Sequence, residues 1–325
     1  MPSKDISIIA IGSLNTDITA LGVKEIIKAG EHTYGEELRL GPGGKSRNIA
    51  QMISVLSGPN KVAMIGRTCR DPFNFWRPPI DALKENGVNT EFVKVFDFEK
   101  KKKFPGIALI AVDKKGRNQI YVLPGISDEF SPEDINDAEK LFQIAQKNNG
   151  ILVLTLELPI QTAIHAMKKA NEYGLMVMLD PGGITKDQNL ESLLDEGIFL
   201  IKPNEHEAKI LTKINVTNFT SAKKAASILL RKGIKNVLIT TGRDGAYVFN
   251  KETSLHIPIP RIEDSGRKDE TGSGDQTMAT ICYGISEGKN ILESSKIAIT
   301  SGTLQYHKTG IIPVTKEELK KYHNL

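Results

Sequence analysis

The sequence predicts an α/β protein in which helices cover both faces of a mostly parallel β-sheet. Short β-branched, apolar runs alternate along the chain with amphipathic helical patterns, as is typical of parallel strands joined by helical crossovers. The 325 residues, 39% hydrophobic and 25% charged, suffice for one large α/β domain or two smaller ones. Ligands of such sheets bind at the carboxyl ends of the strands.

The expected elements follow this alternation in chain order. Apolar runs predict strands at Ile6–Gly12, Val62–Gly66, Ile151–Thr155, Leu175–Leu179, Ile198–Ile201, Val237–Thr240 and Ala246–Phe249. Helical periodicity predicts helices at Ser46–Leu56, Ile160–Tyr173, Glu205–Leu211, Ser221–Lys232, Asp275–Glu287 and Leu292–His307. Two stretches interrupt the pattern, Ile18–Leu40 and Glu91–Leu123, and the second contains a predicted hairpin of Gly106–Val112 and Asn118–Leu123.

We therefore expect a three-layer α/β/α sandwich formed by a single domain, residues 1–325. The interrupting stretches would form a small β-sheet lid from about residues 13–41 and 91–123. Within the second stretch, Lys100 to Lys103 form a run of four lysines. A solvated loop at a sheet edge is the favoured interpretation, and a clamp on a phosphorylated substrate is the alternative.

Composition excludes several classes of protein. The formal net charge of +4 is small and spread along the chain, so it suits an anionic substrate such as a nucleotide without predicting nucleic-acid binding. The two cysteines, Cys69 and Cys282, lack CxxC spacing, which argues against a disulfide scaffold or a zinc site. No apolar run approaches the ~18 residues of a membrane span, and the N-terminus does not resemble a signal peptide. We expect a cytoplasmic protein.

The segment from Asp269 to Asp275, Asp-Glu-Thr-Gly-Ser-Gly-Asp, stands directly before a predicted helix. The N–H groups of Gly272, Ser273 and Gly274 would point out of the helix start, where the helix dipole favours a migrating phosphoryl group. Asp275 would then orient an acceptor hydroxyl and accept its proton late in the transfer. Taken alone, the segment fits a plain loop and a first-turn acid equally well.

Polar residues and paired glycines follow other predicted strands or open helices. Asn and Asp side chains can hydrogen-bond vicinal hydroxyls, and Gly-Gly lets a sugar ring lie against the backbone. Each segment alone also fits turn or helix-start chemistry. Gly44-Lys45-Ser46 is no Walker loop, because Arg39 stands where its upstream glycine belongs. The candidate substrate-binding residues are Asn15, Asp17, Gly43, Gly44, Lys45, Asn48 and Glu157.

Asn204 and Glu207 are three residues apart at a predicted helix start, after a strand. They could hold a hydrated Mg²⁺ together with nucleotide phosphates, because Mg²⁺ favours few carboxylates and several waters. Helix-cap chemistry is the alternative. No GxGxxG follows the first strand, so a nicotinamide-dependent oxidoreductase is excluded.

These segments, in this order, resemble the ribokinase or PfkB family of carbohydrate kinases. Gly43-Gly44 with Asn48 resembles the first signature of the family. Asp269–Asp275 resembles its second signature, which is written DTxGxGD, and Asn204–Glu207 resembles its NxxE motif. The resemblance covers nearly the whole chain. It implies a doubly wound sheet with a β-lid that is often used for dimer contact, so a homodimer is expected. It also implies ATP and Mg²⁺ as cofactors, and frequently K⁺.

By match, the resemblance makes Asp275 the catalytic base and Gly272 to Gly274 the anion hole. Thr240 and Gly242 match nucleotide-site positions, and Asp269 and Thr271 match the neighbourhood of the monovalent cation.

The chain departs from the family pattern at several positions. Glu270 stands where the family usually has Thr, and Lys268 stands where it usually has an apolar residue. Both replacements count against potassium activation. Arg47 replaces a small residue near the sugar site and could alter substrate choice.

The expected reaction is ATP-dependent phosphorylation of a hydroxymethyl group of a sugar, with Asp275 as general base. A nucleoside kinase is the first alternative, because Phe104 and Tyr121 could face a base, and a sugar-phosphate kinase is the second. A catalytically silent protein on the same scaffold is a third.

Overall fold

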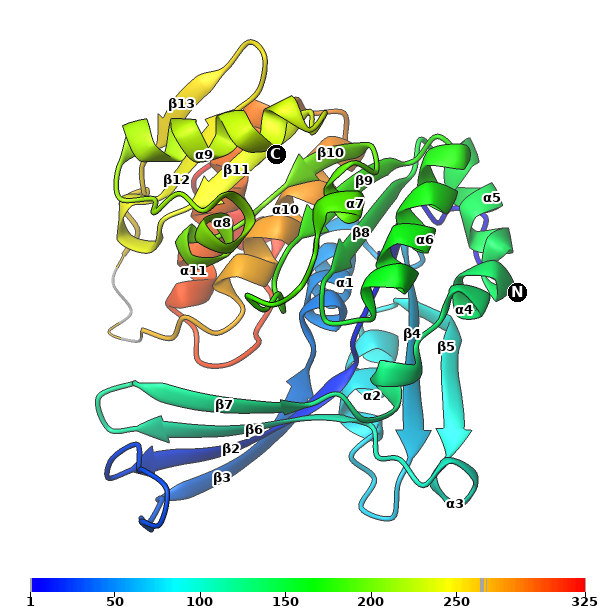
Figure 1. Ribbon diagram of the computed structural model, residues 1–325, viewed down its shortest axis with the longest axis vertical. Helices are drawn as coiled ribbons and strands as arrows, with labels where there is room; N and C mark the ends of the chain where they lie inside the picture. The colour runs from blue at the N-terminus through cyan, green and yellow to red at the C-terminus, as the bar shows by residue number, and fades with distance from the viewer. Residues whose placement is uncertain (1, 264–265, 267, 325) are drawn as a thin grey trace.

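The computed structural model describes residues 2–263, 266 and 268–324 and contains two β-sheets (Figure 1). The larger has nine strands in the order β13-β12-β11-β10-β9-β8-β1-β4-β5. Its strands from β5 to β11 pair in parallel, and β12 and β13 add antiparallel pairs at one edge. The strands are β1 Ile8–Ile11, β4 Val62–Arg70, β5 Asn89–Asp97, β8 Ile151–Thr155, β9 Met176–Asp180, β10 Ile198–Ile201, β11 Asn236–Thr240, β12 Ala246–Phe249 and β13 Ser254–Ile257.

Helices cover both faces of the large sheet, which confirms the predicted α/β layers. One face carries α4 Pro132–Asp137, α5 Glu139–Lys147, α6 Ile160–Glu172, α7 Glu191–Leu194, α8 Glu205–Thr212 and α9 Phe219–Arg231. The other carries α1 Lys45–Ser57, α2 Arg77–Glu85, α10 Ser273–Ser286 and α11 Ile291–Tyr306. The short helices are α3 Phe98–Lys101, α12 Lys316–Lys320, η1 Gly125–Glu129 and η2 Gly242–Asp244.

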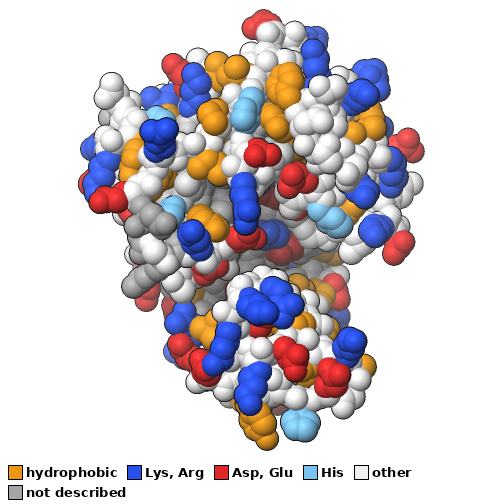
Figure 2. Space-filling view, turned by 90° about the vertical axis from the view of Figure 1, so that its left-hand side faces the viewer, with side chains coloured by type: hydrophobic (Ala, Val, Ile, Leu, Met, Phe, Trp, Pro, Cys, Tyr) orange, Lys and Arg blue, Asp and Glu red, His pale blue; other side chains and the backbone are white. Residues whose placement is uncertain are grey.

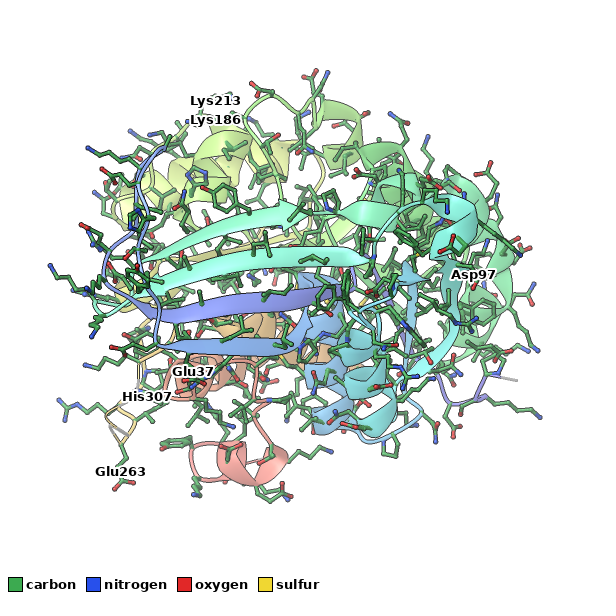
Figure 3. All side chains as sticks on the ribbon, turned by 90° about the horizontal axis from the view of Figure 1, so that it is seen from below. Glu37, Asp97, Lys186, Lys213, Glu263 and His307 are labelled. Carbon is green, nitrogen blue, oxygen red and sulfur yellow. The ribbon has the colours of Figure 1, made fainter. Side chains whose placement is uncertain are left out.

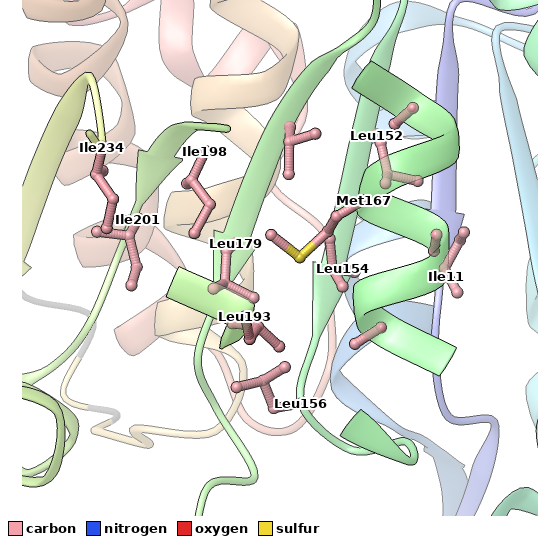
Figure 4. Packing of buried hydrophobic residues seen from close by; sticks show 14 of the residues in the cluster. Ile11, Leu152, Leu154, Leu156, Met167, Leu179, Leu193, Ile198, Ile201 and Ile234 are labelled. Carbon is pink, nitrogen blue, oxygen red and sulfur yellow. The ribbon is translucent and has the colours of Figure 1, made fainter. Parts of the chain in front are cut away.

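The central strands are buried on both sides, which explains their near-continuous apolar runs. In β1, Ile9 and Ile11 pack into the core under α5 and α6, whereas Ile8 and Ala10 pack into the core under α1 and α10. Figure 4 shows the first of these cores, where Met167 of α6 lies over Leu154 of β8. Each such side chain, fully buried, contributes about 1.5–3 kcal/mol to folding.

The chain reverses its winding direction at β1, and this reversal positions the site. From β1 it proceeds through β4 to β5 on one side, and from β8 through β9 and β10 to β11 on the other. The carboxyl ends of β1 and β8 therefore flank a topological switch point, the place where open α/β sheets bind ligands. Ser13, Asn15 and Glu157 all follow these two strand ends.

The smaller sheet has four strands in the order β3-β2-β6-β7 and lies across the carboxyl ends of the large one (Figure 1). Its strands are β2 Asn15–Val23, β3 Glu37–Gly43, β6 Gly106–Asp113 and β7 Asn118–Leu123, so the predicted hairpin is present.

The small sheet uses less of the chain than the predicted 13–41 and 91–123. Residues from 91 to 97 belong to β5 of the large sheet, because Phe92 and Val93 pack into opposite cores of the main body. Within the described part of the chain, no helix has the length and apolarity needed to cross a bilayer.

Candidate active site

Asp275 lies in the first turn of α10, which begins two residues earlier than predicted, at Ser273. Its carboxylate is 4% exposed and accepts a 2.7 Å hydrogen bond from Asn48 Nδ2. Lys45 Nζ lies 3.9 Å from the other carboxylate oxygen. The first and second signature segments therefore meet at the starts of α1 and α10.

The start of α10 presents unpaired amides beside this carboxylate. Gly272 is the N-cap residue with φ +75°, a left-handed conformation that favours glycine. In the described structure the N–H groups of Gly274 and Asp275 have no hydrogen-bond acceptor. The N–H of Ser273, by contrast, donates to Glu270 O at 3.2 Å, so Ser273 does not offer the free amide that the sequence predicted. The free amides at this helix end are suited to an anion.

The glycine pair before α1 packs tightly on the segment that follows β1. Gly44 has φ +91°, and a Cβ atom there would lie 2.6 Å from the Ser13 carbonyl oxygen. A Cβ atom on Gly43 would lie 1.9 Å from Asp17 Oδ1. Neither position tolerates a side chain without movement, so the loop holds Asp17 against the backbone of Gly43.

Arg47 is fully buried beneath this loop. Its guanidinium donates to the carbonyl oxygens of Pro42, at 2.8 Å, and Gly43, at 3.2 Å, and to the side-chain oxygens of Asn48 and Gln51. Burial lowers the pKa of Arg47 to about 10, although the negative charges of Asp17 and Asp275 raise it in part. Because Arg47 binds the amide oxygen of Asn48, it orients the Asn48 nitrogen toward Asp275.

Three charged groups surround this centre. Burial raises the pKa of Asp17 to about 6; Arg47 opposes the shift, and the charges of Glu157 and Asp275 add to it. Burial also raises the pKa of Glu157, although its Oε2 accepts the Lys45 N–H at 2.9 Å and the Ser13 hydroxyl. The nearby Asp275 carboxylate is the main cause of the raised pKa of Lys45.

A cavity of about 480 Å³ opens beside these residues, between the strand ends and the small sheet. The side-chain oxygen of Asn15 is buried in its wall and has no hydrogen-bond partner among the described residues. A ligand hydroxyl could supply that partner. The lining residues are Ser13, Asn15, Val122, Pro124, Ser127, Asp128, Leu156, Glu157, Leu158, Pro159, Ile160, Gly183 and Gln188.

A second cavity, of about 560 Å³, lies on the other side of the α10 start. Four of the predicted nucleotide residues line it, Asn204, Thr240, Gly242 and Gly274, whereas the fifth, Gly272, is not among its lining residues. Figure 2 shows the recess that separates the end of the small sheet from the main body on this side of the molecule.

Asn204 and Glu207 form a reciprocal cap on α8. Asn204 Oδ1 accepts the Glu207 N–H at 2.8 Å, and Glu207 Oε2 accepts the Asn204 N–H at 2.9 Å. The helix-cap alternative raised for this motif is thus present, and only Glu207 Oε1 remains outside the cap for water-mediated contacts. Burial and the neighbouring Asp180 raise the pKa of Glu207, whereas Lys202 lowers it.

Sequence reasoning missed the buried ion pair between Lys202 and Asp180, whose Nζ and Oδ2 atoms are 2.8 Å apart. Lys202 Nζ lies 3.7 Å from where a Cβ atom of Gly274 would stand, so a positive charge abuts the α10 start. The sequence carried a signal, because Asp180 directly follows a predicted strand and Lys202 directly precedes the Pro-Asn of the NxxE motif.

Asp269 and Thr271, the residues matched to a cation site, flank Glu270, which lines the second cavity. Asp269 Oδ1 accepts the Thr271 N–H at 2.9 Å, and Oδ2 accepts the Gly310 N–H at 2.8 Å. Both carboxylate oxygens are therefore engaged with backbone.

The model of the pfkB family of carbohydrate kinases matches residues 5–317. The chain belongs to this family. Its activity class is accordingly phosphoryl transfer to an alcohol. A ribokinase from Haemophilus influenzae is 30% identical to this kinase over 315 residues, which are 95% of this chain and 96% of that protein.

Solved structures show the same ribokinase-like fold. The structure of Arabidopsis thaliana ribokinase with ribose and ATP has a TM-score of 0.82 and 24% identity, and the match covers 99% of this kinase and 98% of that chain. The structure of phosphofructokinase-2 from Escherichia coli in complex with potassium has a TM-score of 0.75 and 18% identity, with 97% of both chains covered.

Proposed function

We propose that this kinase transfers the γ-phosphoryl group of ATP to a hydroxymethyl group of a ribose-like sugar, with Asp275 as the general base. One observation carries the proposal: the Asp275 carboxylate, held by Asn48 at 2.7 Å, stands beside two unpaired amides at one helix start. The candidate sugar residues Asn15 and Glu157 line one cavity, and Glu157 accepts the N–H of Lys45, whose ammonium pairs with Asp275. Most of the candidate nucleotide residues line the other cavity, together with the start of this helix.

In the proposed reaction, Asp275 orients the acceptor hydroxyl and takes its proton as the phosphoryl group arrives. The transferring group carries its charge on peripheral oxygens, so the amides of Gly274 and Asp275 and the Lys45 ammonium stabilise it electrostatically. A late proton transfer suits a carboxylate, which is a weak base. Asn15 and Asp17 hold the sugar hydroxyls, and Glu157 fixes the Lys45 backbone.

Mg²⁺ is part of the proposal through Asn204 and Glu207. Their oxygens would reach it through water, in keeping with the preference of Mg²⁺ for few protein ligands plus phosphate oxygens. When bound, the ion would neutralise charge on the nucleotide phosphates. The hydrogen bond from the Asn204 N–H would keep Glu207 oriented.

The cavity beside Asn15 favours a free sugar over a nucleoside. None of its described lining residues is aromatic, whereas a base would need a stacking partner. Phe104 packs instead against Phe98, with ring centroids 4.8 Å apart, and Tyr121 is 58% exposed.

The same cavity also argues against a sugar phosphate. No lysine or arginine is among its described lining residues. The lysines of the 100–103 run pair with acids: Lys101 and Lys103 contact Glu129, and Lys102 contacts Glu99.

A substrate panel tests the proposal. Ribose, 2-deoxyribose, hexoses, nucleosides and fructose 6-phosphate would each be incubated with ATP and Mg²⁺, and ADP release recorded. Turnover with a pentose well above that with nucleosides and the sugar phosphate supports the proposal. Preferred turnover of a nucleoside would contradict the sugar assignment while leaving the kinase family intact.

We also propose that the small sheet mediates a homodimer. Strand side chains alternate between faces: Asn15, Asp17 and Val122 share the face toward the cavity. The opposite face is open in Figure 3 and presents exposed apolar side chains from three strands. These residues are Leu38, Leu40, Leu109, Tyr121 and Leu123.

Light scattering tests the dimer. A Leu40→Asp, Leu109→Asp double variant should be monomeric at concentrations where the parent is dimeric, because two buried carboxylates oppose association. A monomeric parent would contradict the proposal.

A further inference from the structure

The loop from Lys308 to Ile312 meets the second signature segment directly behind the α10 start. Asp269 joins the two, because its carboxylate accepts the N–H groups of Thr271 and Gly310. The Asp269 N–H in turn donates to Tyr306 O at 2.9 Å. The carbonyl oxygens of Thr271 and Gly310 share a side-chain donor, and Gly310 O also accepts the Ile312 N–H at 3.1 Å.

That side chain is Gln305, in the last turn of α11, and it is fully buried. Its Nε2 donates to Gly310 O at 2.7 Å and to Thr271 O at 3.3 Å. An amide nitrogen has two hydrogens, and here each meets a carbonyl oxygen. The reverse orientation would press Oε1 against two other oxygens, so the contacts fix which way the amide points.

A monovalent cation at this place would need the same oxygens. Carbonyl and carboxylate oxygens are the ligands that replace the hydration shell of such an ion. Here both Asp269 oxygens accept backbone N–H groups, and both carbonyls accept Gln305. Each of these oxygens has a further lone pair, but the Gln305 nitrogen stands between the two carbonyls, so a cation cannot contact both while the amide is there.

The loop also has its own positive charge. Lys308 Nζ donates to Pro313 O at 3.0 Å and pairs with Glu318 at 2.8 Å.

A Cβ atom on Gly272 would stand 3.7 Å from Gln305 Nε2, so the amide lies directly behind the N-cap of the helix that carries Asp275. Gln305 thus braces the start of α10 from within the protein.

We propose that this kinase works without a monovalent cation, because the Gln305 amide occupies the position between the Thr271 and Gly310 carbonyls that such an ion would take. Removing the amide leaves Thr271 O without a donor and leaves Gly310 O with only the Ile312 N–H, beside Asp269, and this variant should accept K⁺. The proposal rests on the phosphotransferase activity proposed above only for its kinetic readout.

The experiment compares wild type and Gln305→Ala in KCl, CsCl and tetramethylammonium chloride at equal ionic strength. ADP release with the preferred sugar is one readout, and the thermal unfolding midpoint of the ligand-free protein is the other. Wild type should give the same rate and midpoint in all three salts. The variant should lose roughly tenfold in rate in tetramethylammonium, as for one or two lost buried hydrogen bonds, and recover in KCl with a raised midpoint.

Gln276→Ala is the matched control. Gln276 is equally buried and accepts the Val314 N–H at 3.0 Å, just beyond the same loop, but none of its hydrogen bonds is to the two carbonyls. It should weaken the protein without creating a response to K⁺. Gln305→Glu provides a variant of the same size, and its carboxylate facing two carbonyls should show the largest dependence on K⁺.

Stimulation of wild type by K⁺ over tetramethylammonium would overturn the proposal. So would a Gln305→Ala variant that ignores K⁺, or a Gln276→Ala variant that responds to it equally. If no sugar is turned over in any salt, the proposed function fails, and the unfolding midpoints still decide the role of Gln305.

Discussion

Replacing Asp17 by Asn should stabilise the protein at neutral pH. Asp17 lies under the Gly43 backbone beside Glu157 and Asp275, and burial raises its pKa from 3.8 to about 6. A group whose pKa is raised in the folded state binds its proton more tightly there. Its contribution to stability is complete below about pH 4 and is lost as the pH rises through about 6.

The shift sets the size of the effect. From 3.8 to about 6 it corresponds to at most about 3 kcal/mol, at 1.36 kcal/mol for each pKa unit. Wild type should therefore lose about that much unfolding free energy between pH 4 and pH 6.5 on account of Asp17, whereas the Asn variant should not. Near pH 4 the two proteins should be about equally stable.

Guanidinium unfolding at pH 4.5, 6 and 7.5 measures this difference. The Asn variant should nevertheless bind the sugar less well, because the Asp17 carboxylate is proposed to bind sugar hydroxyls. Its KM for the sugar should rise about 10- to 100-fold, as for the loss of a hydrogen bond to a charged group. A variant that is less stable than wild type at pH 7.5, or whose stability difference does not depend on pH, would refute the reasoning.

The remaining predictions concern other parts of the site. Arg47→Met should reduce kcat and destabilise the fold by about 3–5 kcal/mol, because four acceptors lose the guanidinium that donates to them. Arg47→Lys should not restore kcat, because an ammonium group lacks the planar set of donors of a guanidinium. A wild-type kcat in Arg47→Lys would contradict this prediction. Gly44→Ala should cost about 1–3 kcal/mol, measured by thermal unfolding, because its φ is +91°. Lys202→Met should cost about 3–5 kcal/mol, measured in the same way, by leaving the Asp180 carboxylate buried without its partner.

The central strands could be predicted from the sequence because burial on both faces produces an unmistakable apolar run. Ile151–Thr155, Ile198–Ile201 and Ala246–Phe249 are strands with the predicted bounds. By contrast, β13 at the sheet edge has three exposed residues and gave no such signal. The helix α2 begins with Arg-Pro-Pro, and prolines in a first turn resemble a loop until the structure shows where the helix starts.

The site was predictable to the extent that it lies at strand ends. Parallel topology brings the ends of β1 and β8 together, so Asn15, Asp17 and Glu157 could be expected to converge. The pairs that orient the catalytic groups were not predictable, because they depend on side-chain packing between distant segments. Arg47 could be flagged as unusual from the sequence, but its hydrogen bond to Asn48 could not, and nothing marked Gln305.

Turnover by Asp275→Asn is the most direct test of the catalytic arrangement. The amide preserves an oxygen that can accept the Asn48 hydrogen bond, so the fold and ATP affinity should be retained. The rate of sugar phosphorylation should fall by about 10²–10⁴-fold, because the variant cannot take up the hydroxyl proton. Near-normal turnover by a variant that binds ATP normally would contradict the assignment of Asp275 and, with it, the mechanism.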